Sequence, residues 1–147
     1  MATSNAATTF LEYRLLSYIF KNNAESFDSP GDNLWIGLAT AISDAEAGSL
    51  TEVNTSTQDS NYVRKQVTAS NWTISSSSTD TATVKNTNNL EWSISAGESS
   101  YTITHVFIAS ASSGGNIYFV GQLTTSRTIT KNDVFRINAN DLIIELK

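Results

Sequence analysis

The pattern of hydrophobic and polar positions changes once along the chain, from the period of a helix to the period of a strand. In residues 10–21, four apolar positions recur at spacings of four, three and one, which places them on one stripe of an α-helix. These positions are Leu11, Leu15, Tyr18 and Ile19. Thr9 and Glu12 have the spacing of a capping box, so we expect the helix to begin at Thr9, after a polar leader.

The apolar stripe of this helix has to be covered, and two alternatives are open. The helix packs on its own domain, or the helix and the polar leader dock on a neighbouring subunit. In the second case Leu11, Leu15 and Tyr18 are the residues that we expect to contact the partner.

From Leu34 onward, short alternating runs of apolar and polar residues are separated by clusters of Ser, Asn, Asp and Gly, which is typical of strands joined by turns. The predicted strands are 34–40, 62–68, 71–75, 81–86, 90–94, 101–109, 117–123, 127–130, 133–138 and 142–146, and two of them could be extensions of their neighbours. This pattern predicts a mainly β fold, an antiparallel β-sandwich or barrel with one N-terminal amphipathic α-helix.

The length of 147 residues fits one domain and is too short for two ordinary ones. We divide this single domain, 1–147, into a polar leader and helix (1–21), an acidic loop-rich segment with one strand (22–61) and a β-rich body (62–147). Charged residues are only 16% of the chain, and 21 Ser and 19 Thr take their place, as on β-rich surfaces. Cysteine is absent, so packing and backbone hydrogen bonds must hold the fold.

The charge and hydropathy of the chain exclude several classes of partner. A formal net charge of -5 argues against nucleic acid, whose phosphates require a basic surface. No apolar run approaches the ~20 residues that span a bilayer, so we expect no membrane partner. The N-terminus also lacks the pattern of a signal peptide, so we expect synthesis in the cytoplasm without export.

Acidic residues concentrate between Lys21 and Arg64, where no basic residue occurs. Seven of the 14 acidic residues lie there, and we expect most of that stretch, 41–61, to form a long excursion outside the sheet that binds a partner. The contact residues proposed for it are Asp44, Glu46, Glu52, Tyr62 and Arg64. Asp44, Glu46 and Glu52 could also hold calcium, although their spacing matches no calcium loop and a solvated acidic loop is the alternative.

The sequence contains little that suggests catalysis. The single histidine, His105, removes most catalytic triads and imidazole metal sites, and no phosphate loop, nucleophile elbow or zincin motif occurs. We therefore predict that the chain is not an enzyme, with no catalytic or metal site and no cofactor. Tyr62 and Trp72 are the aromatic residues that we expect to be exposed if the protein stacks on a sugar.

Several short motifs follow one another in a fixed order. They are the amphipathic helix 10–21, the apolar strand 34–41 ending in Thr40-Ala41, Thr51-Glu52-Val53, Tyr62-Val63-Arg64, Thr104-His105-Val106-Phe107-Ile108, Gly114-Gly115-Asn116, Gly121-Gln122-Leu123-Thr124 and the aliphatic strand 142–146. This order resembles a family of small bacteriophage virion proteins described as tail-fibre-like or head-decoration proteins. The chain departs from that family at residues 54–61, which contain no glycine.

The resemblance implies a non-enzymatic structural protein located in the virion. Because the 147 residues include no fibrous shaft, the favoured hypothesis is a capsid decoration or cement protein that binds the major capsid protein and itself, as a homo-oligomer expected to be a trimer. The acidic stretch would then face basic coat surface. The alternative is a tail-tip or tail-fibre module that binds a host-surface glycan through Tyr62 and Trp72.

Overall fold

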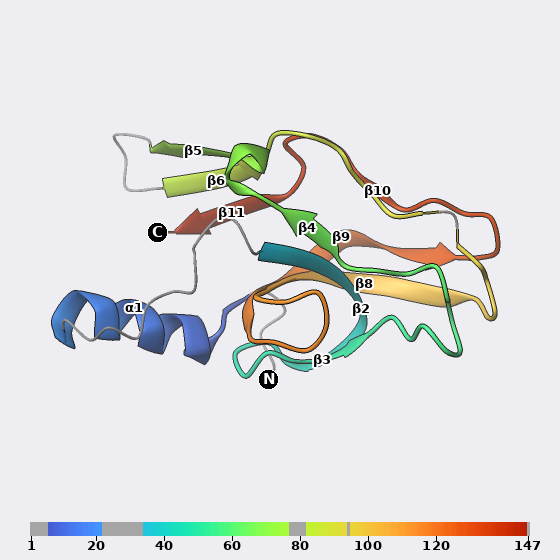
Figure 1. Ribbon diagram of the computed structural model, residues 1–147, viewed down its shortest axis with the longest axis horizontal. Helices are drawn as coiled ribbons and strands as arrows, with labels where there is room; N and C mark the ends of the chain where they lie inside the picture. The colour runs from blue at the N-terminus through green and yellow to red at the C-terminus, as the bar shows by residue number, and fades with distance from the viewer. Residues whose placement is uncertain (1–5, 22–33, 77–81, 94, 147) are drawn as a thin grey trace.

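The fold is a curled antiparallel sheet packed against two smaller sheets, with one α-helix projecting from the end of the body (Figure 1). The computed structural model describes residues 6–21, 34–76, 82–93 and 95–146. The described residues are mainly β, and the predicted class, a β-sandwich or barrel with one N-terminal helix, is confirmed. Among the described helices, none has the length and apolar character needed to cross a membrane.

The large sheet has six strands in the order β1-β9-β8-β2-β3, with β4 beside the first part of β2. Its strands are β1 (Ala6–Ala7), β2 (Leu34–Asp44), β3 (Ser49–Glu52), β4 (Lys65–Val67), β8 (Tyr101–Ala109) and β9 (Ile117–Ile129). The β8–β9 ladder is the longest in the described chain, and β8 lies between β9 and β2 at the centre of the large sheet.

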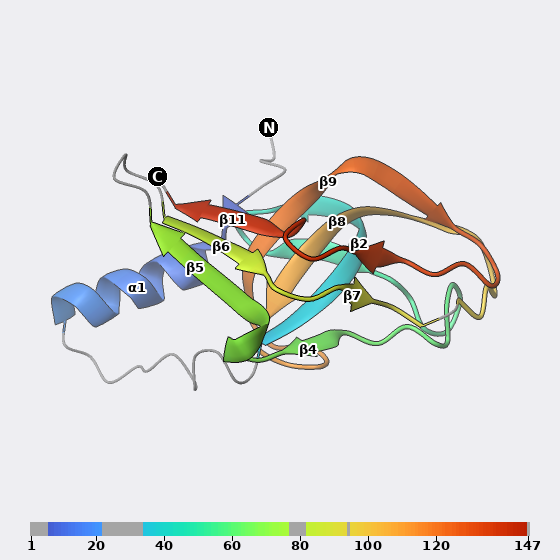
Figure 2. The same cartoon turned by 90° about the horizontal axis from the view of Figure 1, so that it is seen from above.

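The smaller sheets lie over one face of the large sheet (Figure 2). One pairs β7 (Leu90–Glu91) with β10 (Arg136–Ile137), and the other has the order β11-β6-β5. Its members are β5 (Trp72–Ser76), β6 (Ala82–Asn86) and β11 (Ile143–Leu146), and a short 3-10 turn, Ala69–Asn71, precedes β5. The α-helix α1 covers Thr9–Lys21 and directly follows β1.

The core has two parts because the large sheet is covered on both faces. The larger cluster lies between the large and small sheets and includes Ile36, Ile103, Ile108, Trp92 and Ile137. The smaller cluster lies inside the curl of the large sheet and consists of Ala39, Ala45, Phe107, Ala109 and Val120. Because side chains alternate along a strand, β8 supplies Ile108 to the larger cluster and Phe107 and Ala109 to the smaller one.

Most predicted strands are present, with shifted ends, and one prediction is wrong. Residues 41–61 were expected to lie outside the sheet, but β2 continues to Asp44 and returns as β3, so the segment contains a hairpin. The two strands predicted at 117–123 and 127–130 are one continuous strand, β9. Residue 94, at the end of the strand predicted over 90–94, lies outside the described residues, as do 1–5 of the leader and 22–33 of the acidic segment.

The start of the helix differs by one residue from the capping box that the sequence predicts. The backbone N–H of Leu11 donates to the side-chain oxygen of Thr8 (3.4 Å), and the N–H of Glu12 donates to the Thr8 carbonyl (3.0 Å). Thr8 is therefore the N-cap, in place of the predicted Thr9.

A glycine beside an aromatic ring at the centre of the sheet generates the first prediction. Gly37 on β2 pairs with Phe107 on β8, and a Cβ atom at Gly37 would lie 2.1 Å from the Phe107 ring. The substitution Gly37→Ala therefore forces the ring to move and is expected to reduce the free energy of unfolding by about 1–3 kcal/mol, measured by urea denaturation.

Gly121→Ala on the neighbouring strand β9 is the matched control. A Cβ atom at Gly121 would lie 3.8 Å from a methyl of Val106, which is an ordinary contact distance, so little change is expected. Equal destabilisation by both substitutions would contradict the argument from the Phe107 ring.

Candidate functional site

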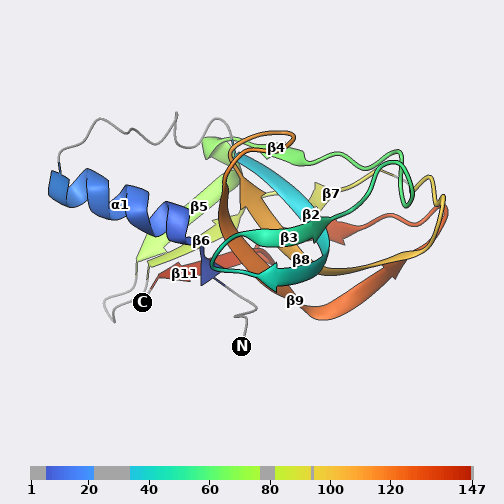
Figure 3. The same cartoon turned by 90° about the horizontal axis from the view of Figure 1, so that it is seen from below.

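Helix α1 leaves the body of the domain at a fixed point. The backbone N–H of Thr8 donates to the carbonyl of Tyr118 on β9 (2.9 Å), and the N–H of Thr9 donates to the carbonyl of Glu46 in the β2–β3 turn (2.9 Å). These two bonds hold the first residue of the helix between two separate parts of the large sheet. The direction of α1 is therefore set by the folded body (Figure 3).

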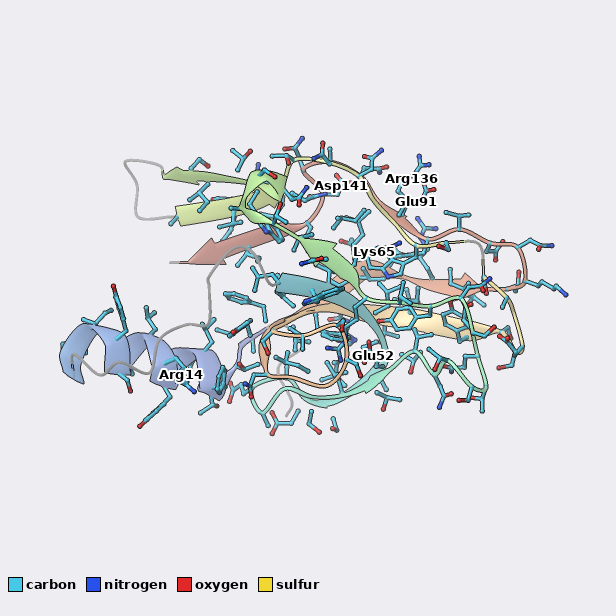
Figure 4. All side chains as sticks on the ribbon, viewed as in Figure 1. Arg14, Glu52, Lys65, Glu91, Arg136 and Asp141 are labelled. Carbon is cyan, nitrogen blue, oxygen red and sulfur yellow. The ribbon has the colours of Figure 1, made fainter. Side chains whose placement is uncertain are left out.

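One side of α1 faces the rest of the chain. The Phe10 and Tyr118 rings lie 5.9 Å apart, the Arg14 guanidinium lies 5.1 Å from the centre of the Phe10 ring, and Ser17 is buried. Arg14 is labelled near the base of the helix in Figure 4. This side contains Phe10, Arg14 and Ser17, and most of the other large apolar residues of the helix are exposed.

Six large apolar side chains of α1 are exposed, with exposed fractions between 44% and 76%. We call this set the α1 apolar face: Tyr13, Leu15, Leu16, Tyr18, Ile19 and Phe20. Three members of the stripe predicted from the sequence, Leu15, Tyr18 and Ile19, lie on it, whereas Leu11 is half-buried. The face is wider than the predicted stripe. In the sequence, the additional aromatic residues of the helix, Tyr13 and Phe20, indicate this greater width.

Of the acidic residues predicted to bind a partner, Asp44 and Glu46 lie together in the exposed β2–β3 turn, and Glu52 lies apart from them at the other end of β3. Asp44 accepts hydrogen bonds from the backbone N–H groups of Glu46 and Ala47 (both 3.1 Å) and stabilises the β2–β3 turn. Glu52 lies at the end of β3, where it accepts hydrogen bonds from Tyr62 and Arg64. In the described part of the chain no group of three His, Asp or Glu residues has the arrangement of a metal site.

Glu52, Tyr62 and Arg64 form one polar cluster. Arg64 donates from Nε and Nη2 to the two oxygens of Glu52, each at 2.8 Å, and the Tyr62 hydroxyl donates to Glu52 at 2.7 Å. The same hydroxyl accepts the backbone N–H of Leu38 at 2.9 Å. Each member of the cluster therefore has a partner within the domain, and Tyr62 and Arg64 are only 6% and 7% exposed.

Arg64 also holds the connection between β8 and β9. Its Nη1 donates to the carbonyls of Ala111 (2.8 Å) and Gly114 (2.7 Å), and its guanidinium lies 4.9 Å from the centre of the Phe107 ring. The bidentate bond to Glu52 raises the pKa of Arg64 above its ordinary value, so the group is charged at any physiological pH. This structural role was not predicted from the sequence, in which its only signal is a tyrosine and an arginine two residues apart.

Asp59, in the loop between β3 and β4, is a buried carboxylate. It accepts the N–H groups of Asn61 and Ala96 (both 3.0 Å) and the hydroxyl of Tyr101 (2.7 Å). Burial by itself raises the pKa of Asp59, but the hydrogen bonds outweigh it and lower the pKa below its ordinary value. Asp59 thus joins the acidic segment to the start of β8.

The two aromatic residues proposed for sugar stacking do not form an exposed platform. Tyr62 is buried in the polar cluster, and Trp72 on β5 is partly buried against the larger core cluster. The indole N–H of Trp72 is buried without a hydrogen-bond partner.

A groove of about 900 Å³ lies between β9 and β11 and was not predicted from the sequence. Apolar side chains such as Phe119 and Ile144 line it together with four charged residues. The charged residues are Arg127, Arg136, Asp141 and Glu145. Strands far apart in sequence meet here, so no local pattern could have indicated the groove.

Comparison with known proteins gives one family. A family model described as "Podophage GP4 fiber I protein gp80" matches residues 6–145, which is nearly the whole chain. No curated protein matches the chain.

Two ion pairs of the same type, one buried and one exposed, generate the second prediction. Arg64→Met leaves Glu52 without its charged partner in a largely buried position, where the Arg64 side chain is 5% exposed and that of Glu52 28%. We expect a loss of about 3–5 kcal/mol in the free energy of unfolding.

The control is Arg136→Met. Arg136 forms an ion pair with Glu91 on β7 (Figure 4). Both side chains are about half exposed, 51% and 47%, so the expected loss is about 0–1 kcal/mol. Urea denaturation of the two variants measures the difference, and equal losses would show that the Arg64 cluster has no special structural role.

The third prediction concerns acid stability. The folded-state pKa of Asp59 lies below the unfolded value of about 3.9, so its contribution to stability is present above pH 4 and is lost as the pH falls through the folded pKa. Asp59→Asn is expected to lower stability at pH 7 and to remove this part of the acid loss, in urea denaturation between pH 7 and pH 2.5. Asp44→Asn is the control, because asparagine accepts the same turn hydrogen bonds. An unchanged acid profile for Asp59→Asn would contradict the assignment.

Proposed function

The chain belongs to the family of podophage GP4 fiber I protein gp80 and is a structural protein of a phage virion; within the virion, we propose that it is a subunit of the tail fibre. The match over residues 6–145 is the observation that carries this proposal, because the family description names a fibre protein. The competing proposal is a head-decoration protein that stabilises the capsid.

The placement of the acidic residues favours the fibre over head decoration. A decoration protein was expected to present the acidic stretch to basic coat surface. Glu52 and Asp59 are instead bonded within the fold, to Arg64 and to Tyr101, whereas Asp44 and Glu46 are exposed in the β2–β3 turn. Glu52 and Asp59 therefore contribute little to an exposed acidic surface.

The carboxylates outside that stretch support a structural role over a catalytic one. Asp133 accepts the N–H and the hydroxyl of Thr130 (both 2.8 Å), and Glu98 accepts the N–H and the hydroxyl of Ser60. Asp141 accepts the side-chain amide of Asn138 at 3.0 Å. These acids stabilise turns and loop contacts, so we propose that the protein is not an enzyme.

The proposal does not include glycan binding by Tyr62 and Trp72. Stacking on a sugar requires an open ring face, and both rings are packed within the domain. Receptor binding, if the assembled fibre has it, would then use another surface.

The fourth prediction tests the location in the virion. Immunogold electron microscopy with antibodies against the purified protein is expected to label the tails of virions that carry this chain and to leave the heads unlabelled. Heads and tails separated on a density gradient provide the control, because the protein should be detected by mass spectrometry in the tail fraction.

Two results would support head decoration instead. They are gold label on the heads, and co-sedimentation of the protein with undecorated capsids together with a raised capsid melting temperature.

A further inference from the structure

The groove between β9 and β11 lies at an open side of the sandwich. β11 is the edge of its three-stranded sheet that lies nearest to β9 (Figure 2), and in the described chain it pairs with a strand, β6, on one side only. On the edge of β9 that faces away from β8, the described strand is β1, which reaches only Phe119 and Val120. The groove therefore lies between two strand edges with room for further pairing.

The apolar floor of this groove is incompletely buried core. Four residues that pack on the larger core cluster but remain partly exposed line it, two on β9 and two on or next to β11: Phe119, Leu123, Leu142 and Ile144. Ile108 of the buried cluster lies in the same lining. One further layer of apolar side chains in the groove would bury all four.

The charges along the groove balance one another. Its lining contains two basic residues, Arg127 and Arg136, and two acidic residues, Asp141 and Glu145. Arg136 is already paired with Glu91, and both it and Asp141 are labelled in Figure 4. The groove therefore has no excess charge with which to select a nucleic acid, a phosphate or another strongly charged ligand.

An extended polypeptide has the chemistry that this groove recognises. A free strand edge binds the main chain of an added segment through N–H and C=O groups, and every second side chain of that segment then points to the same face. On the groove side, such side chains would contact the four partly buried residues of the floor. A saccharide has hydrogen-bonding groups for the strand edges but no row of apolar side chains for the floor.

The sequence of the chain itself does not supply such a segment, which needs an apolar residue at every second position. The stretches outside the described residues contain only three large apolar residues, Met1, Phe27 and Ile94, each in a different stretch. The described strands already belong to sheets. A second copy of the chain has the same sequence, so the occupant is expected to come from a different protein.

We propose that the groove binds an extended segment of a different protein, which pairs with the free edge of β11 and places alternate apolar side chains on the floor. The segment thereby adds a strand to the three-stranded sheet and completes the core at its open side. This interaction is independent of whether the chain lies in the tail or on the head.

The fifth prediction is protection of β11 by an added strand. The probe is the uncharged peptide acetyl-Thr-Val-Thr-Val-Thr-Val-Thr-amide, whose valines share one face of an extended chain. At saturating peptide, the amide protons of β11 that point away from β6 are expected to exchange with solvent about tenfold more slowly, measured by NMR on the full chain. β5 is the internal control, because it is the opposite edge of the same sheet and does not line the groove. Its exchange rates should not change.

A matched pair of variants tests the apolar floor. Leu123→Glu places a carboxylate among the partly buried residues and is expected to weaken peptide binding by about tenfold or more, measured by isothermal titration calorimetry. Ser126→Glu introduces the same charge at an exposed position of β9 outside the lining and should leave binding unchanged. Circular dichroism checks that both variants are folded.

A second probe keeps the test decisive if Leu123→Glu does not fold. It is the same peptide with every backbone nitrogen methylated, which retains the side chains but cannot donate backbone hydrogen bonds. This peptide should not bind the unmodified chain.

Four results would refute the proposal. They are no binding of the first peptide, equal slowing of exchange at β5 and β11, equal binding of the methylated peptide, and slow exchange of the same β11 amides before any peptide is added. The last result would show that the chain's own residues or a second copy fill the groove. None of them changes the expected tail location, so failure of this inference is distinguishable from failure of the proposed function.

Discussion

The arrangement of the large sheet depends on the hydrogen bonds and the ring contact of the Arg64 guanidinium. It bonds to Glu52 at the end of β3, to the carbonyls of the β8–β9 connection, and lies over the Phe107 ring. That ring in turn occupies the space left by the absent side chain of Gly37. A single cation thus links an edge strand, a loop and the central ladder in a protein that has no disulfide.

Strands with many buried side chains were predicted well from the sequence, because burial requires a regular pattern of apolar residues. The bounds of β8 are the predicted ones, because its side chains serve the core on both faces. β9 was divided in two because its residues between Leu123 and Ile129 are exposed and polar, which an edge position in the sheet permits. β3 was missed for a similar reason, since its four residues alternate only between exposed and half-buried.

The sequence indicated which residues of α1 share one side of the helix, but not which parts of the chain lie around them. The period of α1 indicated the positions of Leu15, Tyr18 and Ile19, but a period cannot show whether the rest of the chain covers a stripe. Arg64 was expected at the surface because charged residues are seldom buried. Its burial depends on Glu52, twelve residues away, and on loop carbonyls about fifty residues away, and such pairings are invisible in a single sequence.

The anchor of α1 has a consequence for the order of events during synthesis. The side chain of Thr8 bonds to the carbonyl of Ile117, 109 positions later in the sequence, and the backbone of Thr8 bonds to Tyr118. A ribosome makes α1 before β9, so nascent chains carry α1 without a fixed direction until its anchor has been made. The helix therefore takes its place on the body only after β9 has been synthesised.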